Sequence, residues 1–131
     1  MTQNPVSTAV LSIGSNAPNS HDMMACCKQW LEHTFELTAF ASAYSTPAIN
    51  GKDADYLNTV AVITTTLPMA ELSAVLKDYE KQCGRTPESK LLGVIPIDLD
   101  IVMWNGTVVR PNDYKQEYFQ KGWREIASKT M

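Results

Sequence analysis

The amino-acid sequence predicts an α+β fold of the ferredoxin-like kind, in which one antiparallel sheet carries two helices on a single face. Short runs of apolar and β-branched residues alternate with two longer segments whose apolar residues recur at helical spacing. The resulting order is strand, helix, strand, strand, helix, strand, which is that of the split βαβ arrangement. The other face of the sheet is then open to a ligand or a partner. Many unrelated functions share this order, so the fold alone does not predict one.

Local signals set the limits of the predicted elements. Asp22 is a suitable N-cap for the first helix, Pro68 suits the first turn of the second, and Gly84 suits its end. Asn105-Gly106 predicts a hairpin turn. The predicted strands are 8–13, 35–44, 57–66, 97–104 and 107–109, the helices are 22–35 and 68–83, the loops are 45–56 and 85–93, and the tail 110–131 is partly helical.

The composition is that of an acidic globular chain. Its 131 residues suit one domain, expected over 1–131, and 44% of them are hydrophobic, which is enough for a core. A net charge of -3 argues against nucleic acid or an anionic membrane as a partner, and no run of about 18 apolar residues predicts a membrane span. The cysteine count of three is odd, and the adjacent Cys26 and Cys27 belong to a kind of pair that rarely forms a disulfide, so we expect no disulfide framework and a reducing cytoplasm. The pair Cys26-Cys27 is interpreted as lying on or near a buried helix face rather than as a metal or redox site.

The stretch around Asp98-Leu99-Asp100 carries the clearest chemical signal. Side chains alternate along a strand, so the two aspartates project from one face, while Leu99, Ile101 and Met103 point toward the helices. Two carboxylates this close repel each other, and a divalent cation removes that repulsion. Oxygen ligands with few protein donors suit magnesium. The alternative is a pair of solvated aspartates on an open sheet face.

Five short blocks in order carry a resemblance to a known enzyme family. They are Ile13-Gly14-Ser15-Asn16, Ala43-Tyr44-Ser45-Thr46-Pro47, Asp55-Tyr56-Leu57-Asn58, Glu80 with Gly84-Arg85, and Ile97-Asp98-Leu99-Asp100-Ile101. With their spacing, about residues 8 to 109 resemble the 6-hydroxymethyl-7,8-dihydropterin pyrophosphokinase family of folate biosynthesis. The resemblance implies an enzyme, mostly monomeric in the family, that transfers pyrophosphate from ATP to the pterin hydroxymethyl group and releases AMP.

The resemblance also implies roles for particular residues. Two Mg²⁺ ions would be held by Asp98 and Asp100, with ATP as co-substrate. The catalytic set would be Asp98, Asp100 and Arg85. The pterin side would be Thr46, Pro47, Tyr56 and Asn58, with Trp123 of Lys121-Gly122-Trp123 as a second aromatic wall. The nucleotide side would be Lys77, Glu80, Arg85, Ile101, Arg110 and Lys121. The alternative for Trp123 is a C-terminal amphipathic helix that covers the sheet.

The departures from the family lie on the ATP side. Leu92 stands where the family has tryptophan, Ile95 where it has a phosphate-binding arginine, and Asn112 where it has histidine. The loop 85–93 has few basic residues, and the tail is shorter than is usual in the family. Each lost arginine–phosphate contact removes about 1.5–3 kcal/mol, so the triphosphate clamp is altered.

Three functions therefore remain open. The first is an active, compact pyrophosphokinase with a rearranged ATP clamp, in which the loops 45–56 and 85–93 act as lids. The second is a catalytically impaired relative that binds a pterin or a nucleotide as a sensor or partner subunit. The third is an interaction domain that uses its open sheet face, although Asp98 and Asp100 would make that face acidic. Retained aspartates favour the first, and the substituted Ile95 and Asn112 positions favour the second.

Overall fold

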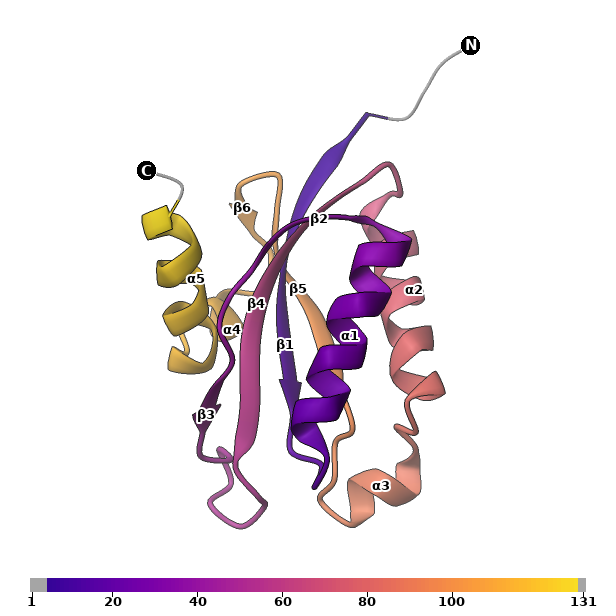
Figure 1. The fold of residues 1–131 in the computed structure, drawn as a ribbon, viewed down its shortest axis with the longest axis vertical. Helices are drawn as coiled ribbons and strands as arrows, with labels where there is room; N and C mark the ends of the chain where they lie inside the picture. The colour runs from indigo at the N-terminus through magenta and orange to yellow at the C-terminus, as the bar shows by residue number, and fades with distance from the viewer. Residues whose placement is uncertain (1–4, 130–131) are drawn as a thin grey trace.

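The computed structural model describes residues 5–129 and confirms the α+β ferredoxin-like fold (Figure 1). The elements in chain order are β1 (Ser7–Ser15), α1 (Ser20–Thr34), β2 (Glu36–Phe40), β3 (Tyr44–Thr46), β4 (Tyr56–Thr65), α2 (Met69–Gln82), α3 (Pro87–Leu91), β5 (Asp98–Trp104), β6 (Thr107–Val108), α4 (Pro111–Tyr114) and α5 (Glu117–Lys129). No helix in the described range is long and apolar enough to cross a membrane.

The sheet has the order β2-β4-β1-β5-β6, and β3 also pairs with β4. Every pair of neighbouring strands is antiparallel. Because β6 is short and pairs only with the end of β5, the beginning of β5 is an edge of the sheet. Figure 1 shows α1 and α2 on one face of the sheet and α5 on the other. The face that was expected to be open is therefore partly covered by the C-terminal helix.

Two hydrophobic cores follow from the alternation of side chains along the strands. The core under α1 and α2 contains Leu11, Ile13, Leu31, Leu72 and Leu99, among others. The second core, under α5, contains Val10, Val60, Val102, Met103, Phe119 and Ile126. Full burial of such side chains contributes about 1.5–3 kcal/mol each. Both faces of the sheet are thus stabilised, and the sheet lies between two layers of helices.

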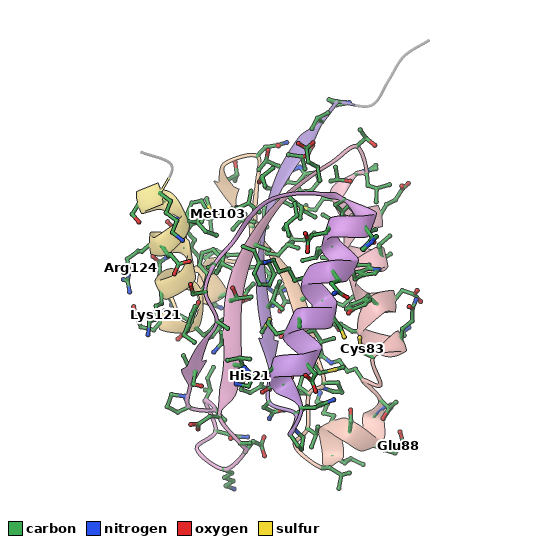
Figure 2. The ribbon with its side chains drawn as sticks, in the orientation of Figure 1. His21, Cys83, Glu88, Met103, Lys121 and Arg124 are labelled. Carbon is green, nitrogen blue, oxygen red and sulfur yellow. The ribbon has the colours of Figure 1, made fainter. Side chains whose placement is uncertain are left out.

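Met103 corrects one prediction from the sequence. It was expected to point toward α1 and α2, but it belongs to the second core and lies near α5 (Figure 2). The cause is an irregularity in the register of β1 and β5, where Val10 pairs with Met103 and the next residue, Leu11, pairs with Ile101. One extra residue on a strand reverses which face the following side chains occupy. Trp104, rather than Met103, packs against the first core.

The predicted strand 35–44 is two strands in the structure. β2 ends at Phe40, and β3 begins at Tyr44. Ala41 leaves the regular ladder but still donates its N–H to Val60 O at 2.9 Å, and its own carbonyl accepts from the buried Thr59 hydroxyl at 2.7 Å. A side-chain hydroxyl therefore replaces one ladder bond and permits the break.

The segment 85–93 was predicted to be a flexible loop, and that was wrong because it contains α3. Thr86 caps this helix: its hydroxyl accepts from Ser89 N, and Ser89 Oγ accepts from Thr86 N. Pro87 suits the first helical position. The Asp22 prediction was also wrong, because α1 begins at Ser20 and Asp22 lies in its first turn.

Candidate functional site

The candidate site lies where the central strand β1 runs between β4 and β5. The strand register places Asn58, Gly14 and Asp98 side by side in one row and Val60, Ser12 and Asp100 in the next. Gly14 has no side chain, so the row is hollow between the amide of Asn58 and the carboxylate of Asp98. A Cβ added at Gly14 would lie 3.3 Å from Asn58 Oδ1 and 3.4 Å from Tyr56 Cδ1. The glycine therefore keeps the floor of the site clear.

A cleft of about 380 Å³ occupies this place, a size that suits a small-molecule ligand. Its lining residues are Ser12, Gly14, Thr46, Pro47, Ala48, Ile49, Asn50, Asp53, Tyr56, Asn58, Asp98, Asp100, Asp113 and Tyr118. The walls come from β3, the loop before β4, and the C-terminal segment. Four aspartates line the cleft and make it acidic, namely Asp53, Asp98, Asp100 and Asp113. An anionic substrate therefore needs cations that accompany it or surround it.

Asn58 is held in one orientation at one end of the cleft. It is buried, and its Nδ2 donates to Thr46 Oγ1 at 2.7 Å and to Tyr56 O at 3.2 Å. Tyr56 is half-buried beside it, and burial, followed by the negative charge of Asp98, raises the pKa of its phenol. An amide that is fixed by its neighbours and a flat aromatic ring suit an aromatic heterocycle with polar edges.

Five charged side chains form a network along the edge of β5. Arg85 Nη1 donates to Asp98 Oδ1 at 2.7 Å and to Glu80 Oε1 at 2.8 Å. Lys77 Nζ donates to Glu80 Oε2 at 2.9 Å and to Asp100 Oδ1 at 3.1 Å. Glu80 is the buried centre of this network. Burial of a carboxylate is tolerated here because two cations share it.

The same network completes the backbone hydrogen bonds of the exposed edge of β5. Leu99 N donates to Glu80 Oε2 at 2.7 Å, and Leu99 O accepts from Lys77 Nζ at 2.8 Å. The two side chains of α2 thus take the place of a neighbouring strand. Because edge strands otherwise offer unpaired backbone groups, this arrangement holds β5, and both of its aspartates, in register.

The network also shifts the protonation of its members. Burial, and next the charge of Asp98, raise the pKa of Asp100, while Lys77 opposes this. Burial by itself lowers the pKa of Lys77, but its hydrogen bond to Glu80 and the charge of Asp100 outweigh that effect, so its pKa is raised. Arg85 behaves in the same way, with Asp98 as the main partner that raises its pKa. Both cations are therefore firmly charged.

The C-terminal segment supplies a wall that sequence reasoning missed. Asp113 and Tyr118 line the cleft, and the Tyr118 hydroxyl donates to Asp113 Oδ1. Arg110 donates from Nε to the other oxygen, Asp113 Oδ2. Tyr118 also accepts, through its backbone carbonyl, a 2.6 Å hydrogen bond from the Tyr44 hydroxyl. In the sequence, only the spacing of Arg110, Asp113 and Tyr118 pointed to this wall. That spacing indicates a site only when the segment is known to fold over β4.

A divalent cation fits Asp98 and Asp100 by the chemistry of the donors. Both carboxylates line the cleft, and each gives one oxygen to a cationic side chain. Within residues 5–129, no three His, Cys, Asp or Glu side chains form a group that could hold a metal ion. Two carboxylates with room for water and phosphate oxygens match the way magnesium is usually bound in phosphoryl-transfer sites. Two carboxylates are too few to form a structural metal site in which the protein supplies all the ligands.

Some residues predicted for the site lie elsewhere. Ile101 is buried in the core under α1 and α2. Trp123 packs against the second core, with its ring 6.2 Å from that of Phe119. Lys121 lies over the Tyr44 ring, 5.4 Å from its centre, on α5 (Figure 2). None of these three is among the cleft-lining residues, so their proposed ligand contacts stay predictions.

The substituted positions on the ATP side are placed as follows. Leu92 is 79% exposed at the end of α3, and Asn112 is an exposed residue of α4. The backbone N–H of Ile95 donates to Asn16 Oδ1 at 2.6 Å, and Asn16 Nδ2 donates to Gly93 O at 2.8 Å. Asn16, in the turn after β1, therefore fastens the segment that leads into β5. This structural role was not predicted.

Two comparisons with known proteins found similar sequences. Residues 10–128 match the model of the family described as 7,8-dihydro-6-hydroxymethylpterin-pyrophosphokinase. Over 103 residues, the chain is 35% identical to a protein of Pisum sativum named folate synthesis bifunctional protein, mitochondrial. That match covers 77% of this chain and 20% of the pea protein, so the chain spans about a fifth of the length of this relative.

Proposed function

This chain belongs to the 7,8-dihydro-6-hydroxymethylpterin-pyrophosphokinase family, and from that premise we propose that it transfers pyrophosphate from ATP to 6-hydroxymethyl-7,8-dihydropterin. The family is one of pyrophosphokinases that use ATP. In the proposed step, the pterin hydroxyl oxygen bonds to the β-phosphorus, the bond from that phosphorus to the α-phosphate oxygen breaks, and AMP leaves. The hydroxyl proton passes to solvent.

One observation carries the proposal: Asn58 and the pair Asp98–Asp100 share one cleft, separated by the bare backbone of Gly14. Such a cleft has a place for a heterocycle at one end and for phosphate-bound cations at the other. Phosphoryl transfer depends chiefly on positioning and on neutralising charge. Both requirements are served by groups that the sheet holds rigidly.

The pterin is proposed to lie at the Asn58 end. Thr46 and Pro47 line that end together with Tyr56. The tyrosine ring offers a stacking surface, and the fixed amide offers hydrogen bonds to the edge of the ring. Tyr118 faces the same cleft from the C-terminal segment, which makes it a second candidate for the opposing aromatic wall beside Trp123.

Magnesium is proposed to be held by Asp98 and Asp100 together with the phosphates. When bound, it would neutralise charge on the transferred group and acidify the attacking hydroxyl. Arg85 keeps Asp98 in position through its 2.7 Å contact. Arg110 is half-exposed and pairs with Asp113, which lines the cleft, so it is proposed as a further cation for a phosphate. The cytoplasmic location and the monomeric state stay predictions, and the mitochondrial location belongs to the name of the pea relative.

The second candidate function is a relative that binds a pterin or a nucleotide without turnover. The observation that favours it is the apolar character of Leu92 and Ile95 at positions where the family has nucleotide-binding residues. If this candidate is right, pterin binding survives and transfer does not. The assay below separates the two.

The test is to mix the protein with 6-hydroxymethyl-7,8-dihydropterin, ATP and Mg²⁺ and to measure AMP. We expect AMP to form in step with the pterin pyrophosphate. Asp98→Asn keeps the shape but removes the charge, and it should lower turnover by about 100-fold or more. Asp78→Asn, which changes an exposed carboxylate on α2, should leave turnover unchanged. Pterin binding without AMP would instead support the non-catalytic relative, and full activity of Asp98→Asn would exclude the metal assignment.

A further inference from the structure

Lys77 has an unusual set of partners for a residue expected at a nucleotide site. Its ammonium group donates to Glu80 Oε2 at 2.9 Å, to Leu99 O at 2.8 Å and to Asp100 Oδ1 at 3.1 Å. Asp98 Oδ1 lies 3.8 Å away. An ammonium has three donors, and all three are used within the protein. Lys77 therefore cannot reach a phosphate without giving up a contact that holds β5 or Asp100.

The position of Lys77 has an electrostatic consequence. Glu80, Asp98 and Asp100 bring three negative charges, and Lys77 and Arg85 bring two positive ones, so one net negative charge is left. Asp100 is a proposed ligand of the metal ion, and it already accepts a hydrogen bond from the Lys77 ammonium. A dication that binds Asp100 would therefore lie close to this positive charge. Like charges this close oppose each other strongly where water is partly excluded. The side chain of Asp100 is only 17% exposed, so screening there is incomplete.

We propose that Lys77 is a built-in counter-cation of the carboxylate pair, which keeps the site from taking up divalent cations until a nucleotide brings its own negative charge. The inference rests on the proposed function, because it gives Asp98 and Asp100 to metal ions. Lys77 is here a positioning residue: it acts on the metal site through Asp100 and is not itself a ligand of the substrate. A polyphosphate would supply the negative charge that offsets the repulsion between two dications and the Lys77 ammonium.

A purely structural role for Lys77 predicts something different. If the lysine only caps the edge of β5 at Leu99 O, its replacement changes stability and leaves metal affinity as it was. The measurement must therefore report metal binding without any turnover. Mn²⁺ serves as the probe, because its free concentration can be followed by electron paramagnetic resonance in the absence of nucleotide.

The experiment compares the wild-type chain with Lys77→Gln, Lys77→Arg and Lys81→Gln. Lys81 is exposed on the same helix and serves as the matched loss of one positive charge. Without nucleotide, we expect Lys77→Gln to bind Mn²⁺ about tenfold more tightly than wild type. Lys77→Arg, which keeps the positive charge, and Lys81→Gln should have Mn²⁺ affinities close to that of wild type. Addition of α,β-methylene ATP should make Mn²⁺ bind tightly to the wild-type chain.

Each outcome decides the inference. Equal Mn²⁺ affinities for wild type and Lys77→Gln would overturn it and leave the proposed function intact. Uptake of two Mn²⁺ ions by the wild-type chain without nucleotide would also overturn it, whether or not the variants fold. If the wild-type chain with α,β-methylene ATP gained no Mn²⁺, the metal assignment itself would fall, together with the role of Lys77.

Discussion

At the scale of single residues, the cleft depends on groups whose importance is not evident from their type. Gly14 lies between Asn58 and Asp98 in the sheet and leaves the space that a ligand would occupy. Asn16 is buried and holds the backbone at Gly93 and Ile95. Gly14 and Asn16 are close together at the end of β1, so one short stretch of chain forms the floor of the cleft and fastens the segment that leads into β5.

Gly14→Ala tests the floor of the cleft. The new methyl group would lie 3.3 Å from Asn58 Oδ1 and 3.4 Å from Tyr56 Cδ1. The Asn58 side chain must therefore shift by a few tenths of an ångström, and the methyl group comes into van der Waals contact with Tyr56. We expect weaker pterin binding by about tenfold, because the pterin would contact both groups. Stability should change by less than about 1 kcal/mol, since alanine suits a strand better than glycine does. Fluorescence quenching by the pterin and thermal unfolding measure the two effects, and unchanged pterin affinity would count against the placement.

At the scale of elements, the C-terminal helix, which packs on the second core, comes very close to the sheet at Gly122. Gly122 of α5 is buried against β4, and a Cβ there would lie only 2.8 Å from Val60 Cγ2. Tyr44 of β3 completes the attachment: its hydroxyl donates to Tyr118 O at 2.6 Å and accepts from Gly122 N at 3.1 Å. The helix can therefore place Tyr118 at the cleft.

Tyr44→Phe removes both of these hydrogen bonds while keeping the ring. We expect a loss of about 1–3 kcal/mol in the free energy of unfolding, because the Tyr118 carbonyl and the Gly122 N–H each lose a hydrogen bond to the Tyr44 hydroxyl. Urea unfolding gives this value. Tyr114→Phe is the matched control in the same segment: the Tyr114 ring packs against the second core, and its hydroxyl makes no hydrogen bond within the described residues. Equal stabilities of the two variants would contradict the role of Tyr44.

At the scale of the whole molecule, the stability of the fold depends on pH through two groups, the buried Cys27 thiol and the half-buried Tyr44 phenol, which are neutral in the folded state. Burial raises the pKa of the Cys27 thiol to about 12 from an ordinary value of 9.0, and it raises the pKa of Tyr44 to about 12 from 10.0. One group lies in the core under α1 and α2, and the other attaches α5 to the opposite face. Both helical layers of the molecule therefore depend on a group that must stay protonated.

Stability is expected to fall in alkaline solution. Above pH 9 the unfolded chain releases the Cys27 proton while the folded chain keeps it, so the unfolded state is favoured as pH rises toward about 12. The slope from Cys27 is at most about 1.4 kcal/mol per pH unit, and Tyr44 adds to it above pH 10. Urea unfolding at pH 8 to 11 measures the slope. Cys27→Ala should flatten it, although that variant is less stable at every pH, and an unchanged slope would contradict the burial of the thiol.

The sequence predicted much of the fold because its strands and helices have strong local signals. The Val/Ile/Thr run of β4 and the apolar stripe of α2 lie within one or two residues of the expected limits. The break between β2 and β3 was not predicted, because it depends on the Thr59 hydroxyl of another strand. The capping pair Thr86 and Ser89 of α3 was a local signal that could have been read.

The sequence by itself determined the alternation that puts Asp98 and Asp100 on one face, since this needs only the period of a strand. It also determined that Thr46, Pro47, Tyr56 and Asn58 belong with them, through the resemblance of short blocks to a family. Only the tertiary structure decided that Lys77 and Glu80 close the edge of β5, and that Asp113 and Tyr118 reach the cleft. Those contacts join residues from separate elements, and their distances depend on how helices pack on the sheet rather than on any local pattern.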